Sequence, residues 1–160
     1  MTLTLPEPKA VLDLLDMFLG QRPPLAPAQG MNLEMPPFGT HVCWLVGADG
    51  ATEGAILTDL AASLYIGGGL IMMPEAALKD MQNSGQVSDA VLDGLGEVCN
   101  NLRGQLNRIG MNPHVSPTDP APYEAPAADG PRGWIYQADK RIDLAGQTAF
   151  GPTNLTIVGR

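Results

Sequence analysis

Residues Ser88–Ile109 read SDAVLDGLGEVCNNLRGQLNRI and form the clearest helical pattern in the chain. Ser88 is a good N-cap and Asp89 is favourable against the helix dipole, whereas Gly110 and Pro113 end the pattern. At 100° per residue the apolar side chains fall on one broad side, which we expect to be buried. They are Val91, Leu92, Leu95, Val98, Cys99, Leu102, Leu106 and Ile109.

The opposite side of this helix is polar and consists of Asp93, Glu97, Asn100, Asn101, Gly104 and Arg108. Glu97 and Asn100 stand at spacing i, i+3, so we expect them to be exposed side by side. A solvated surface is the ordinary explanation of such a face. Stability alone does not explain this one, because Asn is a poor helix former and Gly104 costs roughly 1 kcal/mol relative to Ala. We therefore interpret it as a surface that another macromolecule approaches.

The first third of the chain predicts one helix, one connector and one β-hairpin. Glu7–Leu19 has Pro near its first turn, a wide apolar face and a glycine after its end. Residues 22–37 contain five prolines and little periodicity, which indicates an extended connector along the surface. His41–Val46 and Thr52–Thr58 are β-rich runs around a turn that contains Asp-Gly, as in a hairpin.

Two shorter helices are expected between this hairpin and the long helix. Asp59 is placed to cap a helix over Leu60–Ile66, and the glycines Gly67–Gly69 are expected to end it. Pro74 is placed to open another short helix, which reaches Met81.

The chain after the long helix predicts an irregular segment followed by strands. Residues 112–131 are rich in Pro and Ala, which indicates an irregular excursion. Strands are expected at Gly133–Ala138, extending toward Leu144, and at Asn154–Val158. The whole pattern predicts a single α+β domain over residues 1–160, in which helices cover an antiparallel sheet.

Composition and charge exclude several classes of function. The chain has 160 residues, of which 44% are hydrophobic and 16% are charged, and its net charge is −8. An acidic chain without a basic stripe is a poor candidate for nucleic-acid binding. No apolar run is long enough to cross a bilayer, and no basic region precedes the apolar residues of the first twenty positions. We therefore expect a cytoplasmic protein that binds neither membrane nor nucleic acid.

The cysteines and histidines do not indicate a metal or redox site. Cys43 and Cys99 each lie in a stretch that is expected to be buried, so we interpret them as reduced core thiols. His41 and His114 are far apart in the sequence and lack neighbouring ligand types, so no zinc site is expected.

The run Asp93-Gly-Leu-Gly-Glu-Val-Cys-Asn-Asn-Leu-Arg-Gly104 resembles the signature helix of the CheC/CheX/FliY phosphatases. That signature is Glu-x-x-Asn-x-x-x-Gly, matched here by Glu97, Asn100 and Gly104. The hairpin His41–Thr58, with Glu-Gly in its second strand, also resembles the family's hairpin, and the match covers roughly residues 39–110. No second Glu-x-x-Asn is found in the earlier half, so the resemblance is closer to the single-site CheX type.

This resemblance implies a protein that removes the phosphoryl group from the aspartate of a CheY-type response-regulator receiver. Asn100 is implied to orient the attacking water, and Glu97 to anchor the receiver through a lysine. The other polar residues of the face are implied to contact the receiver: Asp93, Asn101, Gly104 and Arg108. The receiver is implied to bring its own Mg²⁺, so the chain needs no cofactor of its own, and a homodimer is expected.

The sequence also departs from the family's pattern. Arg103 stands where a small residue usually precedes the glycine, and Gln105 stands where Asn is common. A noncatalytic adaptor that uses the same helix face to bind receivers is therefore an alternative. A globular protein of unrelated role, with an accidental match to the motif, is another.

Overall fold

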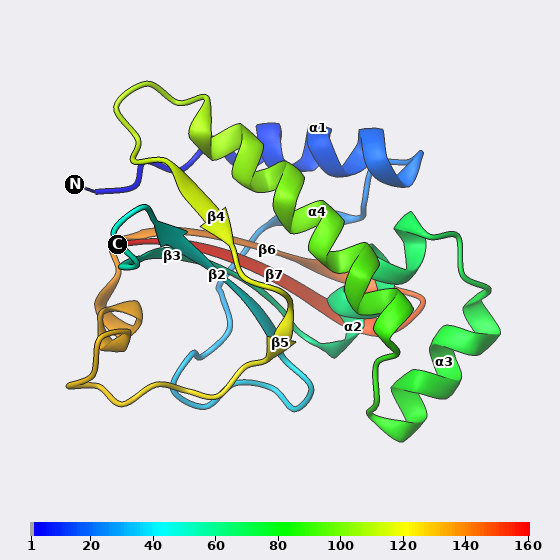
Figure 1. Cartoon of the computed structure of the whole chain (residues 1–160). Coiled ribbons are helices and arrows are strands. Elements are labelled where there is room, and N and C mark those ends of the chain that lie inside the picture. Colours follow the sequence, from blue (N-terminus) through cyan, green and yellow to red (C-terminus); the bar gives the residue numbers. More distant parts are fainter. Residues whose placement is uncertain (1) are drawn as a thin grey trace.

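The computed structural model describes residues 2–160 and has an α+β architecture. Seven strands form one antiparallel sheet, and the α-helices gather on one of its sides (Figure 1). This is the fold class that the sequence predicts. Within the described residues, no helix has both the length and the apolar composition that are needed to cross a membrane.

The predicted hairpin is the centre of the sheet. β2 (His41–Gly47) pairs antiparallel with β3 (Thr52–Thr58), with His41 opposite Thr58. The strand order is β1-β6-β7-β3-β2-β4, and β5 also pairs with β2. The other strands are β1 (Leu25–Pro27), β4 (Val115–Pro117), β5 (Ala121–Pro122), β6 (Lys140–Thr148) and β7 (Gly151–Gly159).

Both proline-rich segments contribute edge strands, which the sequence did not predict. The connector 22–37 contains β1, which pairs with β6. The segment 112–131 contains β4 and β5, which both pair with β2. Proline is tolerated at a sheet edge because a strand there needs only half of its N–H groups for pairing. Strands of two or three residues are too short to show the alternation of apolar and polar side chains by which a strand is predicted.

The expectation of a strand over Gly133–Ala138 was wrong. Gly133–Gln137 form a 3₁₀-helix, and the strand β6 begins only at Lys140. A short apolar run does not distinguish a strand from a helical turn. Here Ile135 is buried in a cluster on the sheet face that the α-helices leave open, so packing decides the conformation.

The expected end of the second helix was also wrong. Asp59 caps α2 (Leu60–Ala62) by accepting a hydrogen bond from the Ala62 N–H at 2.8 Å, as predicted. The helix then continues as a π-helical segment, Ser63–Gly68, through two of the three glycines. These glycines serve close packing instead, because a Cβ on Gly67 would lie 2.5 Å from the Val91 carbonyl oxygen.

The three remaining helices agree with the sequence to within a few residues. α1 is Pro8–Leu19, α3 is Glu75–Ser84 and α4 is Asp89–Asn107. The Ser88 hydroxyl caps α4 by accepting from the Val91 N–H at 3.4 Å. Of the eight apolar residues expected inside, Leu92 and Ile109 are only partly buried.

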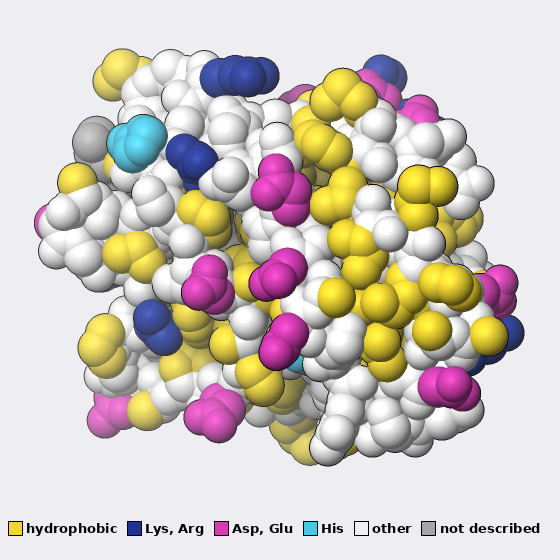
Figure 2. All heavy atoms as spheres, turned by 45° about the vertical axis from the view of Figure 1, so that its right-hand side comes forward, with side chains coloured by type: hydrophobic (Ala, Val, Ile, Leu, Met, Phe, Trp, Pro, Cys, Tyr) yellow, Lys and Arg dark blue, Asp and Glu magenta, His cyan; other side chains and the backbone are white. Residues whose placement is uncertain are grey.

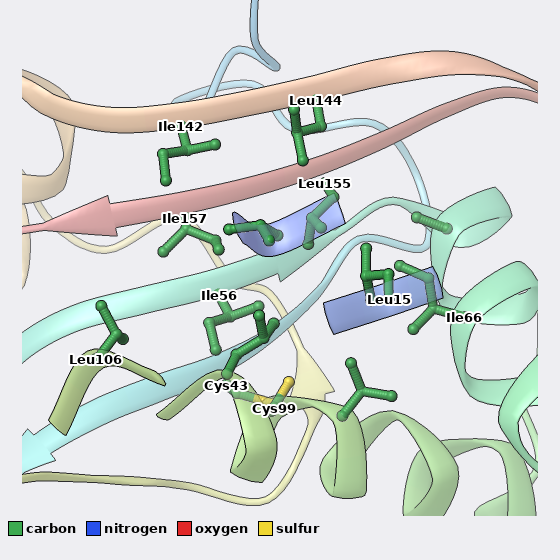
Figure 3. Close-up of a cluster of buried hydrophobic side chains, with 14 of the residues drawn as sticks. Leu15, Cys43, Ile56, Ile66, Cys99, Leu106, Ile142, Leu144, Leu155 and Ile157 are labelled. Atoms are coloured by element: carbon green, nitrogen blue, oxygen red, sulfur yellow. The ribbon is translucent and has the colours of Figure 1, made fainter. Parts of the chain in front are cut away.

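The main core lies between the sheet and the helices α1 and α4 (Figure 3). In this core Cys43 of β2 and Cys99 of α4 lie together, and both are free thiols. The neighbouring Cys43 and burial both raise the pKa of the Cys99 thiol. A second cluster covers the other face of the sheet and includes Met31 and Leu33 of the connector.

Candidate functional site

A groove of about 770 Å³ runs along the exposed side of α4. Its first wall is α4 itself, and its second wall is the segment 116–120, which begins in β4. Both Glu97 and Asn100 line it. The full lining is Asp89, Leu92, Asp93, Gly96, Glu97, Asn100, Arg103, Ser116, Pro117, Thr118, Asp119 and Pro120.

The rotation of α4 places the candidate residues in this groove. Leu95, Cys99 and Leu102 are each no more than 2% exposed and face the sheet. Glu97 and Asn100 lie on the opposite side and are exposed, as the sequence predicts. Because two side chains at spacing i, i+3 on one helix are neighbours, the carboxylate and the carboxamide reach the groove together.

Hydrogen bonds to the backbone hold the second wall in place. Asn107 at the end of α4 bonds twice to Val115: its Nδ2 donates to the carbonyl and its Oδ1 accepts from the N–H, both at 3.0 Å. Further along, the Thr118 Oγ1 accepts from the Trp44 N–H at 2.9 Å. Asn107, a poor helix former on the polar side of α4, therefore has a structural role.

The Asn100 carboxamide has a partner within the helix. The Arg103 Nη2 donates to the Asn100 Oδ1 at 2.5 Å. A guanidinium has only donors, so the atom that faces it must be the carboxamide oxygen. The Arg103 Nε is buried and has no hydrogen-bond acceptor among the described residues.

The groove carries a strong excess of negative charge. Four carboxylates line it, from Asp89, Asp93, Glu97 and Asp119, whereas Arg103 is the basic side chain in its lining. Such a groove favours a cationic group of a partner, and the neutral Asn100 carboxamide can both donate and accept hydrogen bonds there. Within residues 2–160, no cluster of three or more His, Cys, Asp or Glu side chains could hold a metal ion.

The remaining predicted partner-binding residues separate into two groups. Asp93 is exposed and lines the groove. Asn101, Gly104 and Arg108 lie outside its lining. The Asn101 Nδ2 donates to the Glu97 carbonyl at 2.8 Å, which is a bond within the helix. A Cβ built on Gly104 would meet no neighbour within 4 Å in the described part of the chain, so the helix surface there is open.

Sequence reasoning missed the second wall and the participation of Arg103 in the groove. The wall belongs to the proline-rich excursion, which has no periodicity that would assign it to α4. Arg103 was visible as a departure from the family's pattern, but its contact with Asn100 follows from the side-chain conformation.

Comparisons with known sequences give no match: no protein-family model fits the chain, and no curated protein is significantly similar. Comparison of structures does find neighbours. A CheC-like superfamily protein from Shewanella sp. PV-4 superimposes with a TM-score of 0.53 at 15% identity, over 95% of this chain and 93% of that one. The chemotaxis protein CheX from Desulfovibrio desulfuricans gives 0.51 at 14% identity, over 95% of each chain.

A third neighbour comes from the CheX–CheY–BeF3–Mg²⁺ complex of Borrelia burgdorferi. Its TM-score is 0.50 at 15% identity, over 94% of this chain and 92% of that one. The chain therefore has the fold of the CheC-like and CheX proteins, which is the fold that the resemblance implied.

Proposed function

We propose that this chain, which has the fold of the CheC-like and CheX proteins, is a phosphatase that acts on the aspartyl phosphate of a CheY-type receiver domain. The observation that carries this proposal is the placement of Glu97 and Asn100, exposed together in one groove beside the open surface at Gly104. The complex that contains both CheX and CheY supports a receiver as the partner of this fold.

In this proposal the Asn100 carboxamide orients the attacking water. The water oxygen forms a bond to phosphorus, the bond between phosphorus and the aspartyl oxygen breaks, and inorganic phosphate and the free carboxylate result. Phosphoryl transfer depends mainly on position and electrostatics, so a neutral amide on a rigid helix is a suitable group for this step. An amide also adds no negative charge beside the phosphoryl oxygens.

Glu97 is proposed to bind a lysine of the receiver. The surrounding carboxylates of Asp89, Asp93 and Asp119 strengthen the attraction for a cationic side chain. They also disfavour a free phosphate ion, so the phosphoryl group must arrive on a partner that neutralises it. We therefore propose that the receiver supplies Mg²⁺. The two free thiols fit a reducing compartment, and we place the protein in the cytoplasm.

The departures from the family's pattern at Arg103 and Gln105 favour the adaptor alternative. An adaptor would use the same helix face to bind receivers without accelerating phosphate loss.

The deciding experiment is a phosphate-release assay on receivers purified from the same genome and phosphorylated with a small acyl phosphate. The wild type should accelerate phosphate loss from at least one receiver beyond that receiver's own rate. Asn100→Ala should lower the maximal rate by about 100-fold with little change in binding, because its contact is made in the transition state. Asn100→Asp should lose at least as much, since a carboxylate repels the phosphoryl oxygens.

Binding without acceleration would establish the adaptor in place of the phosphatase. Full activity of Asn100→Ala would show that the assigned mechanism is wrong. If the protein binds none of the receivers, both the phosphatase and the adaptor function are excluded.

A further inference from the structure

Arg103 and Asn100 form a pair on one face of α4. They stand at spacing i, i+3, and the Arg103 Nη2 donates to the Asn100 Oδ1 at 2.5 Å. An exposed asparagine on a helix can ordinarily rotate its carboxamide by 180° and exchange the places of oxygen and nitrogen. Beside a guanidinium only one of these orientations makes a hydrogen bond. The Asn100 oxygen therefore faces Arg103, and its Nδ2 points the other way.

Stability does not account for the position of Arg103. Its Nε is buried without an acceptor among the described residues. A buried donor without a partner is destabilising. A helix selected for stability alone would carry at this position a residue that leaves no donor unsatisfied. The contact with Asn100 is the side-chain hydrogen bond that Arg103 makes in this conformation.

We propose that Arg103 is a positioning residue that sets the orientation of the Asn100 carboxamide and thereby the maximal rate of dephosphorylation. This inference rests on the proposed phosphatase function. The carboxamide oxygen has two lone pairs: one accepts a hydrogen bond from Arg103, and the second accepts a hydrogen bond from the attacking water. The Nδ2 group is then directed to donate to a phosphoryl oxygen. Arg103 thus reaches the reaction through Asn100 and touches neither water nor phosphate.

A double-mutant cycle tests this coupling. Arg103→Met keeps an unbranched apolar stem and removes every donor. In single-turnover assays with the phosphatase in excess, it should lower the maximal rate about tenfold and leave the half-saturating concentration unchanged. In the Asn100→Ala background the same change should cause no further loss, because its target is gone. Arg103→Lys, which retains a cationic donor group at the end of the side chain, should recover part of the rate.

A matched control removes one positive charge elsewhere. The control variant is Lys9→Met. Lys9 lies on α1, where it forms an exposed ion pair with Asp13. The variant changes the net charge as Arg103→Met does and should leave the rate unchanged. Thermal unfolding should show that both variants are folded.

Other outcomes overturn the inference. Independent, multiplying losses in the cycle would mean that Arg103 acts on the phosphoryl group directly. A raised half-saturating concentration with an unchanged maximal rate would make Arg103 a docking residue.

A second readout needs no activity. The Asn100 side-chain amide, observed by ¹⁵N NMR, should gain fast motion in Arg103→Met and keep its order in Lys9→Met. If that amide is equally ordered in Arg103→Met, the inference is wrong whatever the activity. If the amide loosens but the wild type dephosphorylates no receiver, the positioning contact stands as a structural fact and the proposed function fails instead.

Discussion

Gly94 of α4 lies directly against Gly67 of the π-helical segment, so closely that a Cβ on Gly94 would come within 2.4 Å of the Gly67 carbonyl oxygen. The π-helical segment approaches α4 equally closely at a second point, since a Cβ on Gly67 would lie 2.5 Å from the carbonyl oxygen of Val91 in α4. Two glycines that are far apart in the sequence therefore allow two backbones to touch. This crossing fixes the position of α4, and with it the groove on the opposite side of the helix.

Gly94→Ala should destabilise the fold. Ala is normally the better helix former, but here its methyl group must displace backbone, and overpacking of this kind costs about 1–3 kcal/mol. The free energy of unfolding in urea measures the change. Gly104→Ala in the same helix is the matched control, because no neighbour lies within 4 Å of its Cβ position. The control should stabilise by about 0.5–1 kcal/mol. Equal effects of the two changes would contradict the close crossing.

Gly104→Ala should also separate stability from binding. If a receiver packs over the open helix surface at Gly104, the added methyl group should weaken binding by roughly 1 kcal/mol, about fivefold, while the protein becomes more stable. Isothermal titration with a receiver that binds the wild type measures this. Unchanged affinity would place the receiver elsewhere on the helix.

Glu97→Gln should weaken receiver binding in a salt-dependent way. The change removes one exposed charge without altering the shape of the side chain, so a loss of about 1 kcal/mol at low salt is expected. The loss should shrink as salt screens the wild-type attraction. Glu7→Gln is the control, since it changes the net charge equally but lies at the start of α1, outside the groove lining. A loss that is independent of salt would argue against a charge contact.

His41 should make the stability of the protein depend on pH. Burial lowers the pKa of its imidazole below the usual 6.5, although a hydrogen bond to the Gly39 carbonyl at 2.8 Å opposes this. The unfolded state then takes up a proton first as the pH falls. Stability should therefore be full above about pH 6.5 and decrease below it, until the folded state is also protonated. Urea unfolding between pH 7.5 and 5.5 should show a steeper decrease for the wild type than for His41→Gln.

The protein should self-associate through apolar surface that the fold leaves uncovered. Met17 of α1 is 70% exposed and Met72 is 88% exposed. Figure 2 shows one face of the molecule, with hydrophobic side chains gathered on its right-hand part beside acidic ones. Exposed apolar surface of this kind is typical of protein contacts. Light scattering should show a mass above the monomer at high micromolar concentration, and Met17→Lys should lower it. A monomeric wild type would refute this.

The local sequence pattern was sufficient to predict the elements that have long, regular periodicity. Ser88 and the apolar stripe predict α4 and its rotation, so the exposure of Glu97 and Asn100 follows from the sequence pattern alone. The hairpin of β2 and β3 is equally clear from its β-rich runs and an Asp-Gly turn. In both cases the signal lies within about twenty residues, because it depends on one helix face or one turn.

Only the tertiary structure decided the shape of the site. The second groove wall at 116–120 is held by Asn107 and by Trp44, which lies 74 residues away from Thr118. The role of Gly67 depends on Gly94, and the orientation of Asn100 depends on the rotamer that Arg103 adopts. Such contacts join segments that are distant in the sequence, so the periodicity of a helix or strand cannot predict them. The sequence therefore determined which residues face outward on α4, and the packing of distant segments determined what they face.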